Sequence, residues 1–243
     1  MKIILSRKGF DSASGGGPSP IVEGIPVSLP IPAGEGRPGV PYGDLGLADH
    51  AALASRGRLG AADLAHHDPM FLPDGTCLFG QCGAAQSHLE NCGVGAGDLF
   101  IFFGLFRQGR ERAHHRIFGW LWVDDVVRSG EPAMEDLRAL GHPHALAAHG
   151  ANDAIYCGPG GTARSSHAEL RLSVEDGPPS LWRVPAWMER SGLSYHGRAD
   201  RWHGDGILQS VSRGQEFVAD IGVGDAGDAD AHEWAHRMLA LMS

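Results

Sequence analysis

The sequence has few cysteines, no long apolar run and no excess of positive charge, and each absence excludes a class of protein. Its 243 residues include 4 cysteines, without paired CxxC spacing and without the density of a disulfide framework, so we expect buried thiols. No apolar run approaches the length of a membrane helix, and the amino terminus has no small-residue cleavage site for a signal peptide. We therefore expect a cytoplasmic protein that does not enter a membrane.

The charge balance is acidic, with a formal net charge of -9. Proteins that grip the phosphates of a duplex need a basic face, so long nucleic acid is an unlikely partner for this chain. A small molecule or a nucleotide is the expected ligand. The sequence leaves the oligomeric state open.

Glycine and proline are abundant, at 36 and 15 residues, which favours a β-rich fold with many turns. The two most apolar runs, Leu99 to Phe106 and Ile117 to Val127, predict a hairpin at the centre of a sheet. Alternating apolar residues predict a further strand from Ala168 to Val174, and a glycine-rich loop is expected just before it, from Cys157 to Ser166. We predict a single α+β domain over residues 1–243, with a mixed or barrel-like sheet, and with short helices around residues 51, 84, 145 and 234.

The connection between the two central runs is polar and rich in basic residues. It is either a solvated tip or a loop that contacts an anion. Its basic residues and histidines are Arg107, Arg110, Arg112, His114, His115 and Arg116.

Histidine is more frequent than core packing requires, with 14 residues, and several lie beside carboxylates or at helix starts. In His67-Asp68-Pro69 the proline keeps Asp68 out of the helical region, and the segment from His142 to His144 opens a predicted helix. Imidazoles and a carboxylate suit a divalent metal, iron or zinc, although surface turns and helix-end polar residues would give the same pattern. The predicted metal ligands are His67, Asp68, His88, His142 and His144.

A glycine-rich loop follows the first predicted strand and carries Arg7, Lys8, Asp11 and Ser12. Backbone N–H groups and a basic side chain in such a loop can bind an anion. The loop has no GK[ST] and therefore is not a P-loop, and a flexible surface loop remains the alternative. Further predicted substrate contacts are Gln86, Trp202, Arg213 and Gln215.

A glutamate near the carboxyl-terminal end of the chain is predicted to be buried. Gly214 allows a bend before Glu216, which then needs a partner because a buried carboxylate is costly. We predict that Glu216, His196 and Tyr195 are catalytic, with a structural ion pair as the alternative for Glu216.

The HEWAH segment from His232 to His236 matches the HExxH pattern of zinc proteases. On a helix, Ala231, Trp234 and Ala235 would form the apolar stripe, and both histidines would lie roughly opposite. We expect this match to be coincidental.

Several stretches stand out when they are taken together: RKGFDS with GGGPSPI, HHDP, FGQCGAAQSHL, GDLFIFFGLFR with RIFGWLWV, HPH, LSYHG with RW, and RGQEFV. From Lys2 to about Asp220 they resemble the bacterial family called nucleotide modification associated domain 3. The resemblance implies an association with nucleotide modification and implies no particular reaction. The central hairpin alone is also similar to PUA-like and EVE-like barrels, which bind modified bases.

Two functions follow as predictions. The first is a metal-dependent enzyme, with non-haem iron as a candidate metal, that acts on a nucleotide, a nucleobase or a related small metabolite at a site lined by histidine and aspartate. The second is a non-catalytic PUA-like module that holds a modified base among Trp120, Trp122, Trp182 and Trp202.

Overall fold

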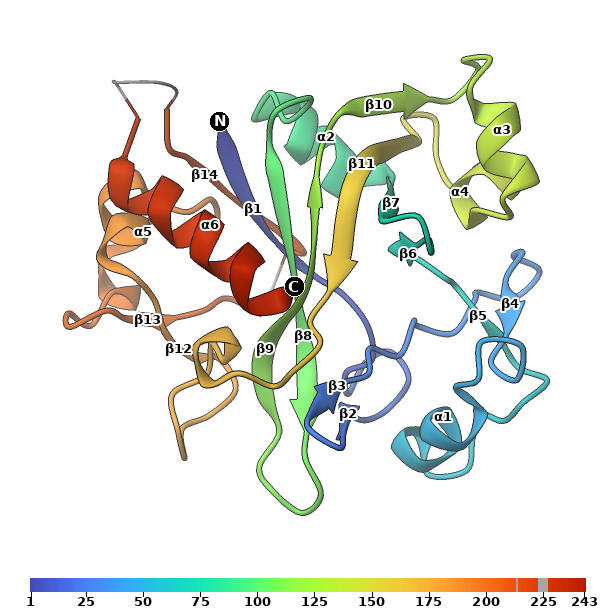
Figure 1. The fold of residues 1–243 in the computed structure, drawn as a ribbon, viewed down its shortest axis with the longest axis horizontal. Helices are drawn as coiled ribbons and strands as arrows, with labels where there is room; N and C mark the ends of the chain where they lie inside the picture. The colour runs from blue at the N-terminus through green and yellow to red at the C-terminus, as the bar shows by residue number, and fades with distance from the viewer. Residues whose placement is uncertain (213, 223–226) are drawn as a thin grey trace.

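The computed structural model describes residues 1–212, 214–222 and 227–243. A curled, mixed sheet of ten strands dominates these residues, with short helices around it, so the predicted β-rich α+β fold is confirmed (Figure 1). The main strand order is β14-β1-β8-β9-β11-β7-β6, and β10 pairs with β11 while β2 pairs with β3 and β8.

The strands of this sheet are β1 (Lys2–Arg7), β2 (Ser19–Val22), β3 (Ile25–Pro26), β6 (Met70–Phe71), β7 (Thr76–Gln81), β8 (Leu99–Arg107), β9 (His114–Trp122), β10 (Asp125–Arg128), β11 (Ala154–Thr162) and β14 (Glu216–Asp220). Two small ribbons pair β4 (Val40–Pro41) with β5 (Leu64–Ala65) and β12 (Leu181–Arg183) with β13 (Ile207–Gln209). The helices are α1 (Ala48–Ser55), α2 (Gly83–Asn91), α3 (Met134–Ala139), α4 (Pro143–Leu146), α5 (Ala186–Ser191) and α6 (Ala229–Met242), with 3₁₀ turns η1 (Ala168–Leu170) and η2 (Ala199–Arg201).

The predicted central hairpin is present as β8 and β9, which pair antiparallel along their length. On the other side of β8 lies β1, in parallel, so β8 is covered along both edges. The polar connection is shorter than expected because residues 114–116 belong to β9 and not to the loop. The strand therefore carries those three side chains onto the sheet.

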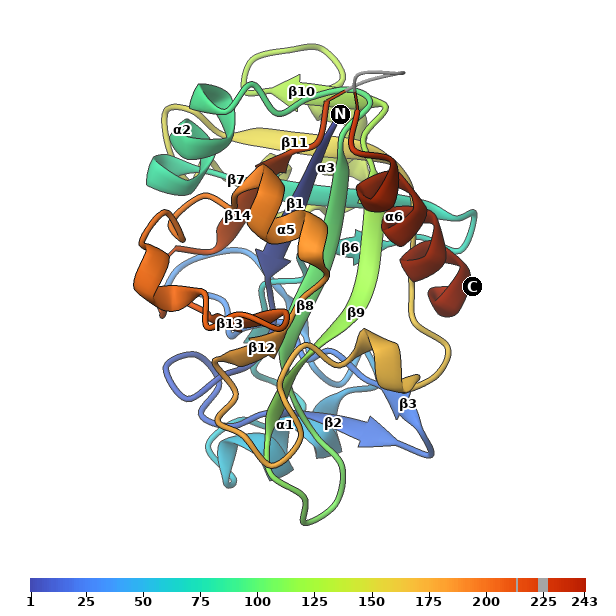
Figure 2. The same cartoon turned by 90° about the vertical axis from the view of Figure 1, so that its left-hand side faces the viewer.

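The two faces of the sheet bury separate apolar clusters. Along β1, Ile3 and Leu5 pack toward α5 and α6, whereas Ile4 packs on the opposite side with Phe79 and Phe100. This alternation follows from the two-residue repeat of a strand. Figure 2 shows α5 and α6 lying over the face of β8 and β9.

The prediction that a glycine-rich loop begins at Cys157 is wrong, because β11 continues through Gly160 and Gly161 to Thr162. Residues 154–159 pair with β7, and residues 160–162 pair with β9. A Cβ on Gly160 would lie 2.4 Å from the Cβ of Cys77. Glycine here allows one strand to pass closely between two others.

The predicted strand from Ala168 to Val174 is also wrong. Its first residues form η1, and the rest makes only single bridges, from Arg171 to Arg116 and from Ser173 to Trp182. Leu170 and Leu172 are nevertheless buried. The alternating apolar pattern therefore predicted that these leucines are buried, but it did not show whether the segment pairs as a strand.

No helix among the described residues is long and apolar enough to cross a membrane.

Candidate functional site

A cavity of about 610 Å³ opens beside the ends of β1 and β7. Its walls come from six places in the chain: the end of β1 with the loop after it, residues 31–37, the segment between β5 and β6, the end of β7, α4 with the segment after it, and Ser212 with Gly214 and Gln215. His66, Asp68, His144 and His149 line it together. A site assembled from such distant segments depends on the tertiary fold.

Asp68, His66 and His144 bring ligand atoms together at this wall. Oδ2 of Asp68 lies 3.9 Å from Nε2 of His66 and 4.0 Å from Nε2 of His144. One ligand atom from each of the three residues lies within 4.8 Å of the others, so the group could hold a metal ion. His149 stacks on His144 with ring centroids 4.3 Å apart, and its ring lies 5.3 Å from that of His66.

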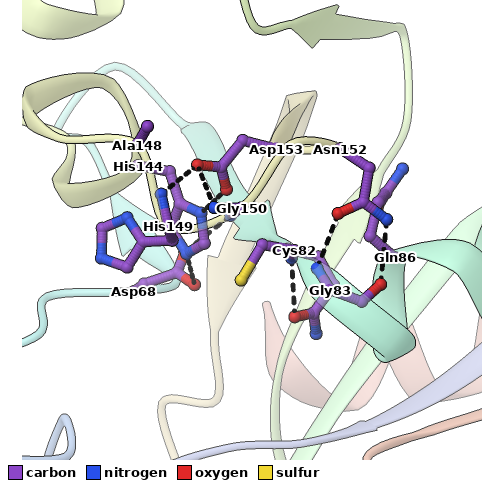
Figure 3. A network of polar contacts seen from close by, with 12 residues as sticks. Asp68, Cys82, Gly83, Gln86, His144, Ala148, His149, Gly150, Asn152 and Asp153 are labelled. Atoms are coloured by element: carbon purple, nitrogen blue, oxygen red, sulfur yellow. Dashed lines mark hydrogen bonds and ion pairs between the residues drawn. The ribbon is translucent and has the colours of Figure 1, made fainter.

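The hydrogen bonds made by each imidazole decide which nitrogen is available to a metal. Asp153 accepts a hydrogen bond from Nδ1 of His144 at 2.7 Å (Figure 3). The carbonyl of Ala147 accepts one from Nδ1 of His149 at 2.7 Å. In the neutral form both rings then carry their lone pair on Nε2. Nε2 of His149 is buried and makes no hydrogen bond among the described residues. A carboxylate that orients a ligating histidine in this way is a common feature of metal sites.

His142 has a different role, because its Nδ1 accepts a hydrogen bond from the backbone N–H of His144. The ring proton therefore lies on Nε2, which is 3.3 Å from Oδ1 of Asp68. The N–H of Gly80 donates to the same oxygen at 2.8 Å. The hydrogen bond from Gly80 thus holds Asp68 in place, Nε2 of His142 lies beside the same oxygen without hydrogen-bond geometry, and Oδ2 faces His66 and His144.

The charge states also suit metal binding. Burial lowers the pKa of His66 to about 4 and lowers that of His144, against the opposing effect of the Asp68 carboxylate. Burial opposes ionisation of Asp68, but the contact with His142 and the neighbouring His144 and Lys8 outweigh it and hold the pKa of Asp68 below its usual range. Neutral imidazoles beside an ionised carboxylate are the forms that bind a cation.

Gly80 makes this arrangement sterically possible. A Cβ at this position would lie 2.3 Å from Cδ2 of His144 and 2.9 Å from Cε1 of His142. The two rings therefore pack directly against the backbone of β7. Behind them, Asn152 accepts a hydrogen bond from the N–H of Gly83 and donates one to its carbonyl, which joins the start of α2 to the turn that carries Asp153 (Figure 3).

Cationic side chains line the same cavity. Arg37 donates to the carbonyl of Ala148 at 2.7 Å, and Arg7 donates to the carbonyls of Ser212 and Val211. Burial lowers the pKa of Arg7, although Asp11 and Glu216 act against it. Arg7 and Arg37 are therefore held by hydrogen bonds to backbone carbonyls, and they line the same cavity as the histidines.

The structure brings some of the predicted site residues to this cavity. Of the predicted metal ligands, Asp68 and His144 belong to the group described above, His142 lies beside Asp68, and His67 is not one of the three ligands. His88 lies on α2, where its Nε2 is 3.0 Å from Oγ of Ser194. Of the predicted substrate contacts, four line the cavity: Arg7, Lys8, Asp11 and Gln215.

Other predicted contacts lie elsewhere, and Ser12 is not among the residues that line the cavity. Gln86 is buried and bonded to Glu90 and Tyr156, while Trp202 donates to the carbonyl of His196. Arg213 falls outside the described residues. Tyr195 and His196 pack on the ring of Phe217.

Glu216 is 1% exposed and is held by two partners. Its Oε1 lies 3.0 Å from Nζ of Lys8 and accepts a hydrogen bond from Nε2 of Gln81 at 2.8 Å. Nζ of Lys8 also lies 4.1 Å from the centre of the Phe79 ring. This geometry matches the structural ion pair that the sequence left as an alternative, and a catalytic role for Glu216 stays a prediction.

Sequence reasoning missed His66, His149 and Asp153 as parts of this group. Composition alone does not show which of the 14 histidines would be metal ligands, and His66 is the immediate neighbour of the predicted ligand His67. The signal that was present is local density, since His142, His144 and His149 lie within eight residues.

The HEWAH segment and Trp182 both lie away from the histidine and aspartate cluster. The HEWAH segment lies on α6, where Ala231 and Ala235 are buried, His236 is exposed, and neither histidine belongs to a potential metal group among the described residues. Trp182 is fully buried and donates to Nδ1 of His115, so its ring cannot stack on a base.

The fold and the site together define an α+β protein with a histidine and aspartate cluster on the wall of a cationic cavity. Residues 2–220 match the family described as nucleotide modification associated domain 3, and the chain belongs to that family. No curated protein and no solved structure matches the chain. The family associates the chain with nucleotide modification.

Proposed function

We propose that the chain is a metal-dependent enzyme that acts on a nucleotide, a nucleobase or a related small metabolite in the cavity beside β1 and β7. The observation that carries this proposal is the convergence of neutral imidazoles and an ionised carboxylate, His66, His144 and Asp68, on a cavity that also presents Arg7 and Arg37. Family membership supports the nucleotide part of the proposal.

Two histidines and one carboxylate favour iron or zinc as the metal. Such a set occurs in non-haem iron(II) sites and in catalytic zinc sites, both of which keep an open position. A metal held there supplies activation of water or of another small ligand. Within the protein, Asp153 orients His144, the N–H of Gly80 orients Asp68, and His149 places a further nitrogen without a hydrogen bond beside the group.

The cavity fits a ligand of nucleotide size. Its volume of about 610 Å³ lies within the usual range of small-molecule sites. Arg7 and Arg37 suit a phosphate, because guanidinium groups bind phosphate oxygens in a bidentate manner. Lys8 is less available, because Glu216 already neutralises its charge.

The first test is the metal content of the purified protein and of variants. Asp68→Asn and His144→Gln should lose a stoichiometric metal that the wild type retains, because each removes one of the three ligands. His236→Gln is the matched control, since this histidine is exposed on α6. A wild type that binds neither iron(II) nor zinc after anaerobic reconstitution would contradict the metal site.

The second test is binding and turnover of nucleoside monophosphates by the metal-loaded protein. Arg37→Gln should weaken binding by roughly tenfold, which corresponds to one lost charge-assisted hydrogen bond. An unchanged affinity would show that the phosphate does not lie at Arg37. Binding without turnover of any tested nucleotide would favour the non-catalytic binding module.

A further inference from the structure

A second cavity, of about 350 Å³, lies where the start of β9 meets residues 166–175, and it shares no lining residue with the first. In Figure 1 the chain leaves β11 and crosses β9 at this place. The polar side chains that line it are Gln108, Glu111, His114, Arg116, Ser166, Arg171, Ser173, Glu175 and Arg183.

Arg116 is a buried cation whose guanidinium is only partly satisfied. The residue is 3% exposed, and its Nη1 makes no hydrogen bond among the described residues. Its Nε contacts Nε2 of His114 at 3.4 Å, and its Nη2 contacts the carbonyl of His167 at 3.3 Å. These contacts are long and fix the guanidinium without neutralising it.

A second arginine lies beside it. Arg171 forms a backbone bridge with Arg116, and its Nε donates to the carbonyl of Ser173 at 3.1 Å. Burial, and then the charge of Arg171, lower the pKa of Arg116 to about 10. Among the described residues no carboxylate lies within 4.0 Å of a charged nitrogen of Arg116, Arg171 or Arg183.

This arrangement is costly without an anion. A buried charge needs a partner, and two neighbouring guanidinium groups repel each other. The nearby imidazole does not add to the charge, because Nδ1 of His114 donates to the carbonyl of Arg112 and burial lowers the pKa of His114 to about 4. Its Nε2 is therefore the acceptor that holds Arg116 in position.

We propose that this second cavity binds the phosphate group of a small phosphorylated molecule, with Arg116, Arg171 and Arg183 as its ligands. Two or three guanidinium groups match the oxygens of a phosphate monoester, and the hydroxyl of Ser166 adds a neutral donor. The volume is small and suits a ligand no larger than a nucleoside monophosphate. Glu111 and Glu175 are exposed and line the same cavity, so they are the competing partners for the arginines.

Titration of the full chain with inorganic phosphate and with AMP tests the proposal, with calorimetry and the NMR signals of the arginine Nε–H groups as readouts. We expect Arg171→Gln and Arg183→Gln each to weaken phosphate binding by roughly tenfold or more. Arg128→Gln is the control for loss of a surface charge. Arg37→Gln, which is expected to weaken nucleotide binding in the first cavity, should leave the phosphate-induced shifts of the Arg116 and Arg171 Nε–H signals unchanged, so failure of one site is distinguishable from failure of the other.

Two further measurements complete the test: the affinities for AMP and for inorganic phosphate are compared, and the stability of a variant at the buried Arg116 is measured. Tighter binding of AMP than of inorganic phosphate is expected, and the reverse order would assign the site to free phosphate. Arg116→Met should be more stable than the wild type in phosphate-free buffer and lose that advantage in saturating phosphate. The proposal is overturned if the wild type binds neither probe, or if Arg171→Gln and Arg183→Gln bind both probes as tightly as Arg128→Gln does.

Discussion

Replacing Gly80 by alanine is the sharpest test of how the histidine cluster is held. The added Cβ would lie 2.3 Å from Cδ2 of His144, whereas ordinary contact begins at 3.4 Å. The imidazole must therefore retreat by about 1 Å, or the strand must move by the same amount. Metal sites tolerate ligand displacements of only about 0.2 Å, so His144 would leave its productive position.

We expect Gly80→Ala to lower the free energy of unfolding by about 1–3 kcal/mol, the usual cost of overpacking. Metal affinity should fall by about 10–100-fold, as it does when the support of a ligand is disturbed. Thermal unfolding and competition with a chelator measure the two effects. Gly95→Ala is the control, because a Cβ there meets nothing within 4 Å. Unchanged stability and unchanged metal affinity in Gly80→Ala would refute the packing of His144 against β7.

Three further outcomes follow from buried groups elsewhere. Glu216→Gln should destabilise the protein by about 3 kcal/mol because it leaves the Lys8 ammonium without a counter-charge, and adding Lys8→Met should restore most of the loss in urea unfolding. Burial lowers the pKa of His115 to about 3, so between pH 3 and 6.5 this residue takes up a proton when the protein unfolds. The free energy of unfolding should therefore decrease as the pH falls below 6.5, and His115 should contribute at most about 1.4 kcal/mol per pH unit. In His115→Gln the decrease should be less steep. On α6, Trp234→Ala should cost about 3 kcal/mol of stability because its ring packs on that of Trp187, whereas Glu233→Gln should leave metal content unchanged. A loss of metal in Glu233→Gln would restore the HExxH interpretation.

The elements with strong local signals could be predicted from the sequence. The hairpin of β8 and β9 follows from two apolar runs that need burial on both faces, and every residue from Leu99 to Phe103 is fully buried. The terminal helix α6 follows from its apolar stripe, of which Ala231, Ala235 and Met238 are buried. In these places the local pattern and the tertiary environment agree.

Pairing between distant segments could not be predicted in the same way. Gly158 and Gly160 are typical of a loop when considered alone, but in β11 they permit close approach to Trp122 and Cys77. Conversely, Leu170 and Leu172 alternate like a strand and are buried without a continuous ladder. In both cases a neighbour from another part of the chain decides the structure.

The choice between His66 and His67 illustrates the same limit at the site. The N–H of His66 donates to the carbonyl of Ile31 beside the bridge between Pro32 and Ala65, so the segment is also paired with residues 31–33, and the side chain of His66 lines the cavity. A shift of one residue along an extended segment exchanges its two faces. The residue types therefore predicted imidazoles and a carboxylate at the site, and the pairing of one short extended segment decides that His66 lines the cavity.

Lys8 and Arg116, two cations that are largely shielded from solvent, differ in one respect that bears on function. Lys8 is neutralised inside the protein by Glu216, contacts Phe79, and so needs no ligand. Arg116 is more deeply buried, but it has another arginine as its neighbour and no carboxylate within 4.0 Å among the described residues. Since an unpaired buried charge is stable only if something outside the chain compensates it, the second arrangement indicates an anion, whereas the first accounts only for stability.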